Sequence, residues 1–285
     1  MLIIPLTVGS DEKGYFDRKC PNENCLCTFK VRLDDYNGKV VYCPICGHAD
    51  IHGKWWTPQQ LEDIEKNVAF FKANNGASLN HLIRQSPEWE LEFTCEKCGS
   101  KYSTIGFGYF CPFCGYSSAK RVFDESIDII SKNLSALSEK LQWYTDKYGK
   151  YKAETICKKE AEGTFRDIVA AFQYFAAQCY SKLSTKKARP NDFQIVEKGD
   201  KLFKKQTGKG YLTWISDIEF EKMNLYFQRR HLIEHKGGIV DPQYIEMSND
   251  NSYKIGQRVV VKEADAFELL SIIKKLGDGL HTLCV

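Results

Sequence analysis

Apolar residues recur every three or four positions through most of the C-terminal half of the chain. This spacing predicts four substantial helices, over 124–148, 164–183, 217–236 and 264–283. An irregular excursion separates the second predicted helix from the third. Amphipathic helices bury their apolar faces against one another, so the pattern predicts a helical bundle over 121–285.

The N-terminal half follows a different pattern, with short runs of β-branched and aromatic residues. Thr28–Arg32 and Val40–Tyr42 are predicted to be strands. Helical spacing over 58–85, with Pro58 at its first position, predicts a connecting helix. The chain is therefore predicted to be mainly α, with two small β modules ahead of the helical bundle.

Cysteine pairs suggest how such small modules could fold. The chain has 12 cysteines, and eight of them form four closely spaced pairs: Cys20 with Cys25, Cys43 with Cys46, Cys95 with Cys98, and Cys111 with Cys114. Intervals of 17 and 12 residues separate the pairs within each set, which is hairpin-sized and typical of zinc ribbons. We predict two structural Zn²⁺ ions per chain. Cys27 in place of Cys25, and His48 in place of Cys46, are alternative ligands.

The cysteine positions also divide the chain. They predict a first ribbon over 1–54, a helical connector over 55–90 and a second ribbon over 91–120. Four thiolates close a zinc site and leave no position for an activated water, so this metal is expected to serve folding and not catalysis. Aromatic residues near the ribbons either complete a thin core or stack on bases, and the choice between nucleic-acid and protein recognition stays open.

Positive charge is concentrated in one segment of the helical half. Residues 1–120 carry a net charge of −1 and residues 121–285 a net charge of +4. Residues 182–209 hold nine basic and three acidic side chains, which suits a phosphate-backbone track, although a solvated loop is the commoner explanation of such a run. The candidate substrate contacts are Lys182, Lys186, Lys187, Arg189, Lys204, Lys205, Arg229 and Lys236.

The helix predicted over 217–236 has an unusual end. Ser216 and Glu219 have capping-box spacing at its start, and Gly237 can end it in a left-handed conformation. Steps of four residues from Phe227 reach His231 and then His235, so two imidazoles continue the apolar stripe. Arg230 lies at the edge of that stripe, where a guanidinium is costly to bury without an anion.

The order of Arg230, His231 and His235 resembles the R-x4-6-H motif of the HEPN superfamily of ribonucleases. The stretch 227–241 is similar to one found in HEPN proteins of bacterial defence and abortive-infection systems, and the similarity covers roughly residues 121–285. The resemblance implies a metal-independent endoribonuclease that acts on RNA as a homodimer. It also implies a toxin or anti-phage effector, with an antitoxin or another defence-system partner.

These residue types suit cleavage of RNA without a metal. Histidine can move protons near neutral pH, and His235 is the stronger candidate for general acid or base because the end of a helix stabilises a cation. Arg230 offers a planar fork of donors to a phosphate. On an ideal helix the two residues lie about 140° apart, so one helix forms an incomplete site. The HEPN resemblance implies that two facing helices complete it.

Other interpretations compete with this one. Arg230 and Glu234 have the spacing of a surface salt bridge, and His231 is more readily an orienting residue than a catalyst. His231 and His235 have the spacing of paired zinc ligands, but no third ligand follows nearby. The alternative function is a non-catalytic zinc-ribbon module that binds nucleic acid or protein and dimerises through its helices.

The expected location is the cytoplasm. Metal-type cysteine pairs suit a reducing compartment and argue against a disulfide scaffold. The apolar segment 2–8 is too short to span a membrane and has no basic residues before it, so it is predicted to be an arm or strand on the first ribbon and not a signal peptide.

Overall fold

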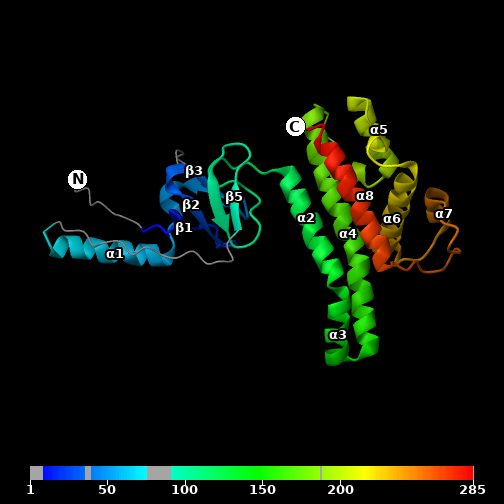
Figure 1. The fold of residues 1–285 in the computed structure, drawn as a ribbon, viewed down its shortest axis with the longest axis horizontal. Coiled ribbons are helices and arrows are strands. Elements are labelled where there is room, and N and C mark those ends of the chain that lie inside the picture. Colours follow the sequence, from blue (N-terminus) through cyan, green and yellow to red (C-terminus); the bar gives the residue numbers. More distant parts are fainter. Residues whose placement is uncertain (1–8, 36–39, 76–90, 187, 285) are drawn as a thin grey trace. The chain divides into compact units, whose positions relative to one another are not determined.

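The computed structural model describes residues 9–35, 40–75, 91–186 and 188–284. The chain divides into two compact units, Met1–Ser118 and Ala119–Val285. The first unit contains all of the described strands, and the second is built from helices (Figure 1). The mainly helical fold with a small N-terminal β region agrees with the sequence prediction.

The first unit is built around one four-stranded sheet. Its strands, in the spatial order β1-β2-β6-β5, are β1 (Tyr15–Lys19), β2 (Thr28–Arg32), β6 (Lys101–Thr104) and β5 (Leu91–Thr94). All neighbouring strands are antiparallel, and a separate two-stranded sheet pairs β3 (Val40–Tyr42) with β4 (Ala49–Ile51).

This sheet joins the two predicted ribbons. Both strands predicted for the first ribbon form, but β2 and β3 lie in different sheets and do not pair with each other. Instead β2 pairs with β6 of the second ribbon, with Phe29 opposite Thr104 and Val31 opposite Tyr102. Phe29, Val31 and Tyr102 are buried. The two ribbons therefore form a single β region and not two independent modules.

The predicted connector begins as expected. Helix α1 (Pro58–Ala73) starts with Pro58 at its first position, and Thr57 and Gln60 form a capping box. The part of the connector beyond residue 75 lies outside the described residues, as does the predicted N-terminal arm over 2–8.

The second unit is a helical bundle centred on its longest helix. Its helices are α2 (Ala119–Ser135), α3 (Leu137–Tyr148), α4 (Lys150–Leu183), α5 (Val196–Thr207), α6 (Asp217–Lys236), α7 (Pro242–Ser248) and α8 (Glu263–His281). Helix α4 contacts α2, α3, α6 and α8, and α2, α4 and α8 run side by side (Figure 1). Buried Phe165, Phe172 and Phe175 of α4 lie in the main core, where Phe175 stacks on Phe123 of α2 at 4.6 Å.

The bundle differs from the prediction at three points. The helix predicted over 124–148 is broken into α2 and α3 at Ala136, whose ψ of −1° departs from helical geometry. Helix α4 starts at Lys150 instead of residue 164, because buried Ala153 and Ala161 let its first half pack against α3. The excursion over 182–209 contains a helix, α5, whose buried Val196 and Phe203 anchor it to the core.

Two cysteine clusters and a candidate active site on helix α6

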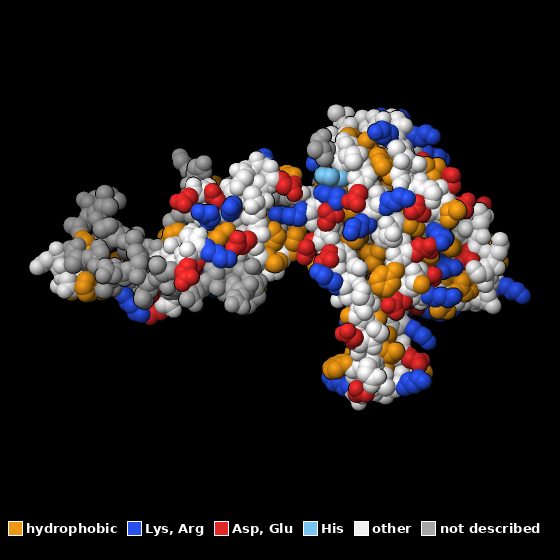
Figure 2. All heavy atoms as spheres, in the orientation of Figure 1, with side chains coloured by type: hydrophobic (Ala, Val, Ile, Leu, Met, Phe, Trp, Pro, Cys, Tyr) orange, Lys and Arg blue, Asp and Glu red, His pale blue; other side chains and the backbone are white. Residues whose placement is uncertain are grey.

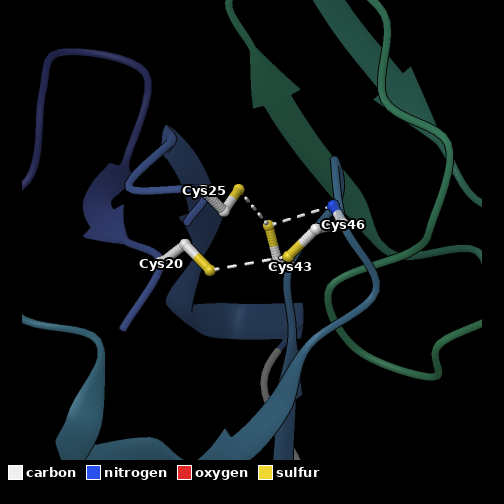
Figure 3. Close-up of side chains that lie close together, drawn as sticks. All are labelled: Cys20, Cys25, Cys43 and Cys46. Atoms are coloured by element: carbon white, nitrogen blue, oxygen red, sulfur yellow. Dashed lines mark hydrogen bonds between the residues drawn. The ribbon is translucent and has the colours of Figure 1, made fainter. Parts of the chain in front are cut away.

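The first cysteine cluster joins two hairpin turns. Cys20 and Cys25 come from the turn between β1 and β2, and Cys43 and Cys46 from the turn between β3 and β4 (Figure 3). The Cys20 and Cys46 sulfurs are 3.8 Å apart, as are those of Cys25 and Cys43. A tetrahedral zinc site with Zn–S bonds of about 2.3 Å has sulfur–sulfur edges of about 3.8 Å. The four thiols are thus spaced to hold Zn²⁺.

Sulfur–sulfur distances also distinguish Cys25 from Cys27, the alternative ligand. The Cys27 sulfur is only 3.2 Å from that of Cys43, which is shorter than a zinc tetrahedron allows between two ligands. The alternative ligand His48 has its Nε2 3.8 Å from a carboxylate oxygen of Asp50. The distances therefore favour Cys25 and Cys46 as ligands.

The second cluster repeats this arrangement. Cys95 and Cys98 lie in the turn between β5 and β6, and Cys111 and Cys114 in the loop that follows β6. The sulfurs of Cys95 and Cys114 are 3.7 Å apart, as are those of Cys98 and Cys111. All eight predicted ligands thus fall into two groups of four, as the sequence spacing indicated.

The two clusters are bound to each other through the backbone. The carbonyl of Pro44, inside the first cluster's second turn, accepts hydrogen bonds from the N–H groups of Tyr109 and Phe110 at 2.7 and 3.0 Å. The N–H of Tyr42 donates to the carbonyl of Pro112 in the second cluster at 2.9 Å. Together with the β2–β6 pairing, these bonds make the metal sites parts of one structure.

Helix α6, which carries the motif, has the predicted ends. The Ser216 hydroxyl accepts from the N–H of Glu219, and the Glu219 carboxylate accepts in return from the N–H of Ser216, which completes the capping box. Gly237 ends the helix with a φ of +63°, and its neighbour Gly238 donates its N–H to the carbonyl of Leu232. Both termini are therefore set by local sequence.

Arg229 is buried and paired, and so is not available to a ligand. Its guanidinium lies 3.0 Å from Asp250, 3.3 Å from Asp265 and 3.4 Å from the Tyr244 hydroxyl. Burial alone would lower the pKa of Arg229, but the hydrogen bonds to Tyr244 and Asp250 raise it. Arg229 fastens α6 to α8 and to the segment after α7. This placement removes Arg229 from the predicted substrate contacts.

Arg230, the next residue, has the opposite environment. It is half-buried and lines a cavity of about 220 Å³ between α6, α7 and the segment that precedes α5. Among the described residues its Nε is buried with no hydrogen-bond partner, and its guanidinium forms no salt bridge, so the pairing with Glu234 that helical spacing permits is absent. Burial lowers the pKa of Arg230, the charge of Glu234 opposes this shift, and the charge of Arg166 adds to it. An anion at this point would satisfy an otherwise unpaired cation.

The two histidines lie together at the same end of α6. His231 and His235 are both exposed, and their ring centroids are 4.8 Å apart. Burial, followed by repulsion from His235 and Arg230, lowers the pKa of His231. His231 lines the cavity with Arg230, whereas His235 is not among its lining residues. No cluster of three or more metal-type side chains includes either histidine in the part of the chain that the structure describes, so the paired-ligand interpretation gains no support.

The predicted basic contacts lie mostly on the surface. Lys182, Lys186, Arg189, Lys204, Lys205 and Lys236 are exposed, and Lys187 lies outside the described residues. Lys182 donates to the carbonyl of Cys284 at 3.4 Å, and Lys236 is 3.9 Å from a carboxylate oxygen of Asp241. On the face shown in Figure 2, basic and acidic side chains of the helical unit are interspersed. From the basic segment, Asn191, Gln194 and Ile195 line the cavity, whereas its lysines are not among the lining residues.

Several cavity residues were not predicted from the sequence. Gln228, Gln243 and Asp241 line it beside Arg230, and Met247 closes part of its wall. Amides carry no motif of their own. The one hint in the sequence is that Gln228 directly follows Phe227, which belongs to the apolar stripe that continues to His231.

Comparisons of the chain with models of protein families, with curated proteins and with solved structures found no match. Within the described residues, no helix combines the length and the apolar character needed to cross a membrane.

Proposed function

We propose that the protein is a metal-independent endoribonuclease of the HEPN type, with Arg230, His231 and His235 as its catalytic residues. The observation that carries the proposal is the half-buried guanidinium of Arg230, whose Nε has no hydrogen-bond partner among the described residues and which forms no salt bridge there, on the same helix end as a pair of adjoining imidazoles. A phosphate satisfies this arrangement in both charge and hydrogen bonding. The two cysteine clusters are assigned to structure, because four thiolates leave zinc no open position.

The chemistry needs two proton transfers and one stabilised phosphoryl group. One imidazole removes the proton of the 2′-hydroxyl, whose oxygen forms a bond to phosphorus while the bond to the 5′-oxygen breaks. A second imidazole gives a proton to the departing 5′-oxygen. His231 is assigned as the base, because burial and the neighbouring charges of His235 and Arg230 lower its pKa and so disfavour its protonated form. His235, in the last turn of α6 beside His231, is assigned as the acid.

A second copy of the chain is part of this proposal. Arg230 and His235 lie about 140° apart on an ideal helix, and His235 is absent from the residues that line the cavity. Two α6 helices facing each other would place the histidine of one chain near the arginine of its partner. The homodimer thus supplies a geometry that one helix lacks.

The direct test is incubation of purified protein with cellular RNA, with and without brief EDTA treatment, followed by mapping of the ends. We expect 2′,3′-cyclic phosphate and 5′-hydroxyl ends, and no loss of rate on chelation while zinc is retained. His235→Ala should slow cleavage by about 100-fold or more. His281→Ala is the matched control, because His281 is the last residue of another helix, α8. A His235→Ala rate equal to that of the control would remove His235 from the mechanism.

Subunit mixing tests the shared site. Arg230→Ala and His235→Ala chains are each expected to be inactive, and their mixture should regain part of the activity if the two groups of one site come from different chains. A monomer whose rate rises linearly with concentration would contradict the shared site. Complete inactivity of the wild type on every RNA would instead favour the non-catalytic zinc-ribbon module.

The biological role rests on the HEPN resemblance alone. We propose that the enzyme acts as a toxin or anti-phage effector, held in check by an antitoxin or another defence partner. Induced expression in a bacterial host should then arrest growth, and His235→Ala should relieve the arrest at equal protein level. Arrest that persists in this variant would separate toxicity from cleavage.

A further inference from the structure

The cavity beside Arg230 is larger than binding of a phosphate requires. Its volume of about 220 Å³ exceeds the roughly 150 Å³ of an apolar cavity known to accommodate benzene. Buried Phe227 and Leu232 line it from α6, buried Val169 from α4, and partly exposed Met247 from α7. A cavity of this size, lined by both apolar and polar side chains and with a cation at its edge, has the dimensions of a flat heterocycle that carries an anionic group.

One polar side chain inside this chamber has no partner. Gln228 is 9% exposed, and its side-chain amide forms no hydrogen bond with any described residue. The neighbouring amide of Gln194 differs, because its Nε2 donates to Gln173 at 3.3 Å and to Asn191 at 3.4 Å. The Gln228 side chain lines the cavity with its amide free of protein hydrogen bonds, so it is placed to bind a group that enters the cavity.

We propose that the cavity is a nucleobase pocket selective for adenine, in which Gln228 pairs with the base while Arg230 holds the adjoining phosphate. This proposal rests on the proposed ribonuclease function and names the base that would lie beside the phosphate at Arg230. A glutamine amide presents one donor and one acceptor side by side. Adenine presents the complementary acceptor and donor at N7 and the 6-amino group, which glutamine engages with two hydrogen bonds.

Through the same edge of the base, guanine fits this amide less well. The corresponding edge of guanine offers two acceptors, N7 and O6, which suit a guanidinium and would leave the Gln228 carbonyl unpaired. A pyrimidine fills less of the apolar chamber and buries less surface against Phe227 and Leu232. Both differences favour adenine, because the penalty for a wrong base is an unpaired buried amide or an unfilled cavity.

Calorimetric titration of the full chain with the four nucleoside 5′-monophosphates tests the pocket without cleavage. AMP should bind at least about tenfold more tightly than GMP, CMP or UMP, the ratio expected from one lost buried hydrogen bond. Gln228→Leu, which keeps size and removes the amide, should weaken AMP about tenfold and abolish the preference. Gln178→Leu is the matched control, since Gln178 is an exposed helical glutamine outside the cavity.

Two results would overturn the pocket. They are equal affinity for all four nucleotides, and no saturable AMP binding at about 10 mM, above the millimolar affinities expected for a small ligand. Gln228→Glu provides a second variant if the leucine fails to fold, and it too should weaken AMP because the donor is lost. Adenine-selective binding without RNA cleavage would support the pocket and contradict the ribonuclease function. Cleavage without adenine-selective binding would support the ribonuclease function and contradict the pocket.

Discussion

Adjacent arginines on α6 should respond in opposite ways to the same substitution. Arg229→Met removes the cation that joins Asp250, Asp265 and Tyr244, and leaves the side chain of Asp250, which is 3% exposed, without its ion pair. Loss of one member of a buried ion pair costs about 3–5 kcal/mol. For a unit of this size, that loss should lower Tm by on the order of 10 °C.

Arg230→Met should be neutral or mildly stabilising. The guanidinium of Arg230 has a buried Nε without a partner, and the pKa-lowering effect of burial exceeds the opposing effect of the Glu234 charge. An apolar side chain of similar length removes that cost, worth about 1 kcal/mol. The same variant should lose RNA cleavage, since the phosphate contact is gone. Substitution of Arg229 is thus expected to reduce stability, and substitution of the neighbouring Arg230 to reduce activity.

The loss of unfolding free energy caused by Arg229→Met should also depend on pH. Burial alone would raise the pKa of Asp250, but hydrogen bonds from Ser252, Tyr244 and Arg229 lower it to about 2. Because the folded pKa is below the ordinary value of 3.8, the stabilisation by this carboxylate is present above pH 4 and is lost as the pH falls toward 2. Without Arg229 the carboxyl takes up its proton at higher pH, so the difference between variant and wild type should narrow below pH 4.

Urea unfolding of the full chain, followed by far-ultraviolet circular dichroism, measures these differences because most of the helix lies in the second unit. Both variants and the wild type are compared at neutral pH and at about pH 3. A deficit below about 1 kcal/mol for Arg229→Met, or equal deficits for both variants, would refute the assignment of Arg229 to structure and Arg230 to function.

Two further predictions concern the cysteine clusters and the helix packing. Metal analysis should find two zinc ions per chain in the wild type and in Cys27→Ser, but about one in Cys25→Ser, and equal zinc loss in both variants would contradict the sulfur distances. Gly277→Ala should cost about 1–3 kcal/mol in thermal unfolding, because its new methyl would overlap the ring of Phe123. Gly163→Ala, with only the end of an arginine side chain nearby, should be neutral or stabilising, and similar losses in both would argue against close packing of α2 on α8.

Features that depend on neighbouring residues were predictable from the sequence. The bounds of α6 follow from the Ser216–Glu219 capping box and Gly237, and both signals act within a few residues. The eight clustered cysteines are likewise local pairs, since a tight turn fixes the two sulfurs of each pair. The helical content followed in the same way from the spacing of apolar side chains.

Pairing between distant segments was not predictable in this way. Besides β1 of its own ribbon, β2 pairs with β6, more than 60 residues further along the chain, where Val31 lies opposite Tyr102. A strand's alternation specifies which face is apolar, but it does not specify which strand lies beside it. For the same reason, the sequence suggested two separate ribbons where the structure joins strands of both in one four-stranded sheet.

The candidate site divides along the same line. The sequence identified Arg230, His231 and His235 by their order along one helix, and it placed Arg229 among the candidate substrate contacts. Only the tertiary structure decided between the two arginines, because Asp250 and Asp265 approach α6 from distant segments and neutralise Arg229 alone. The sequence specifies the charge of a side chain. Whether that charge is paired depends on which other segments the fold brings within a few ångströms of it.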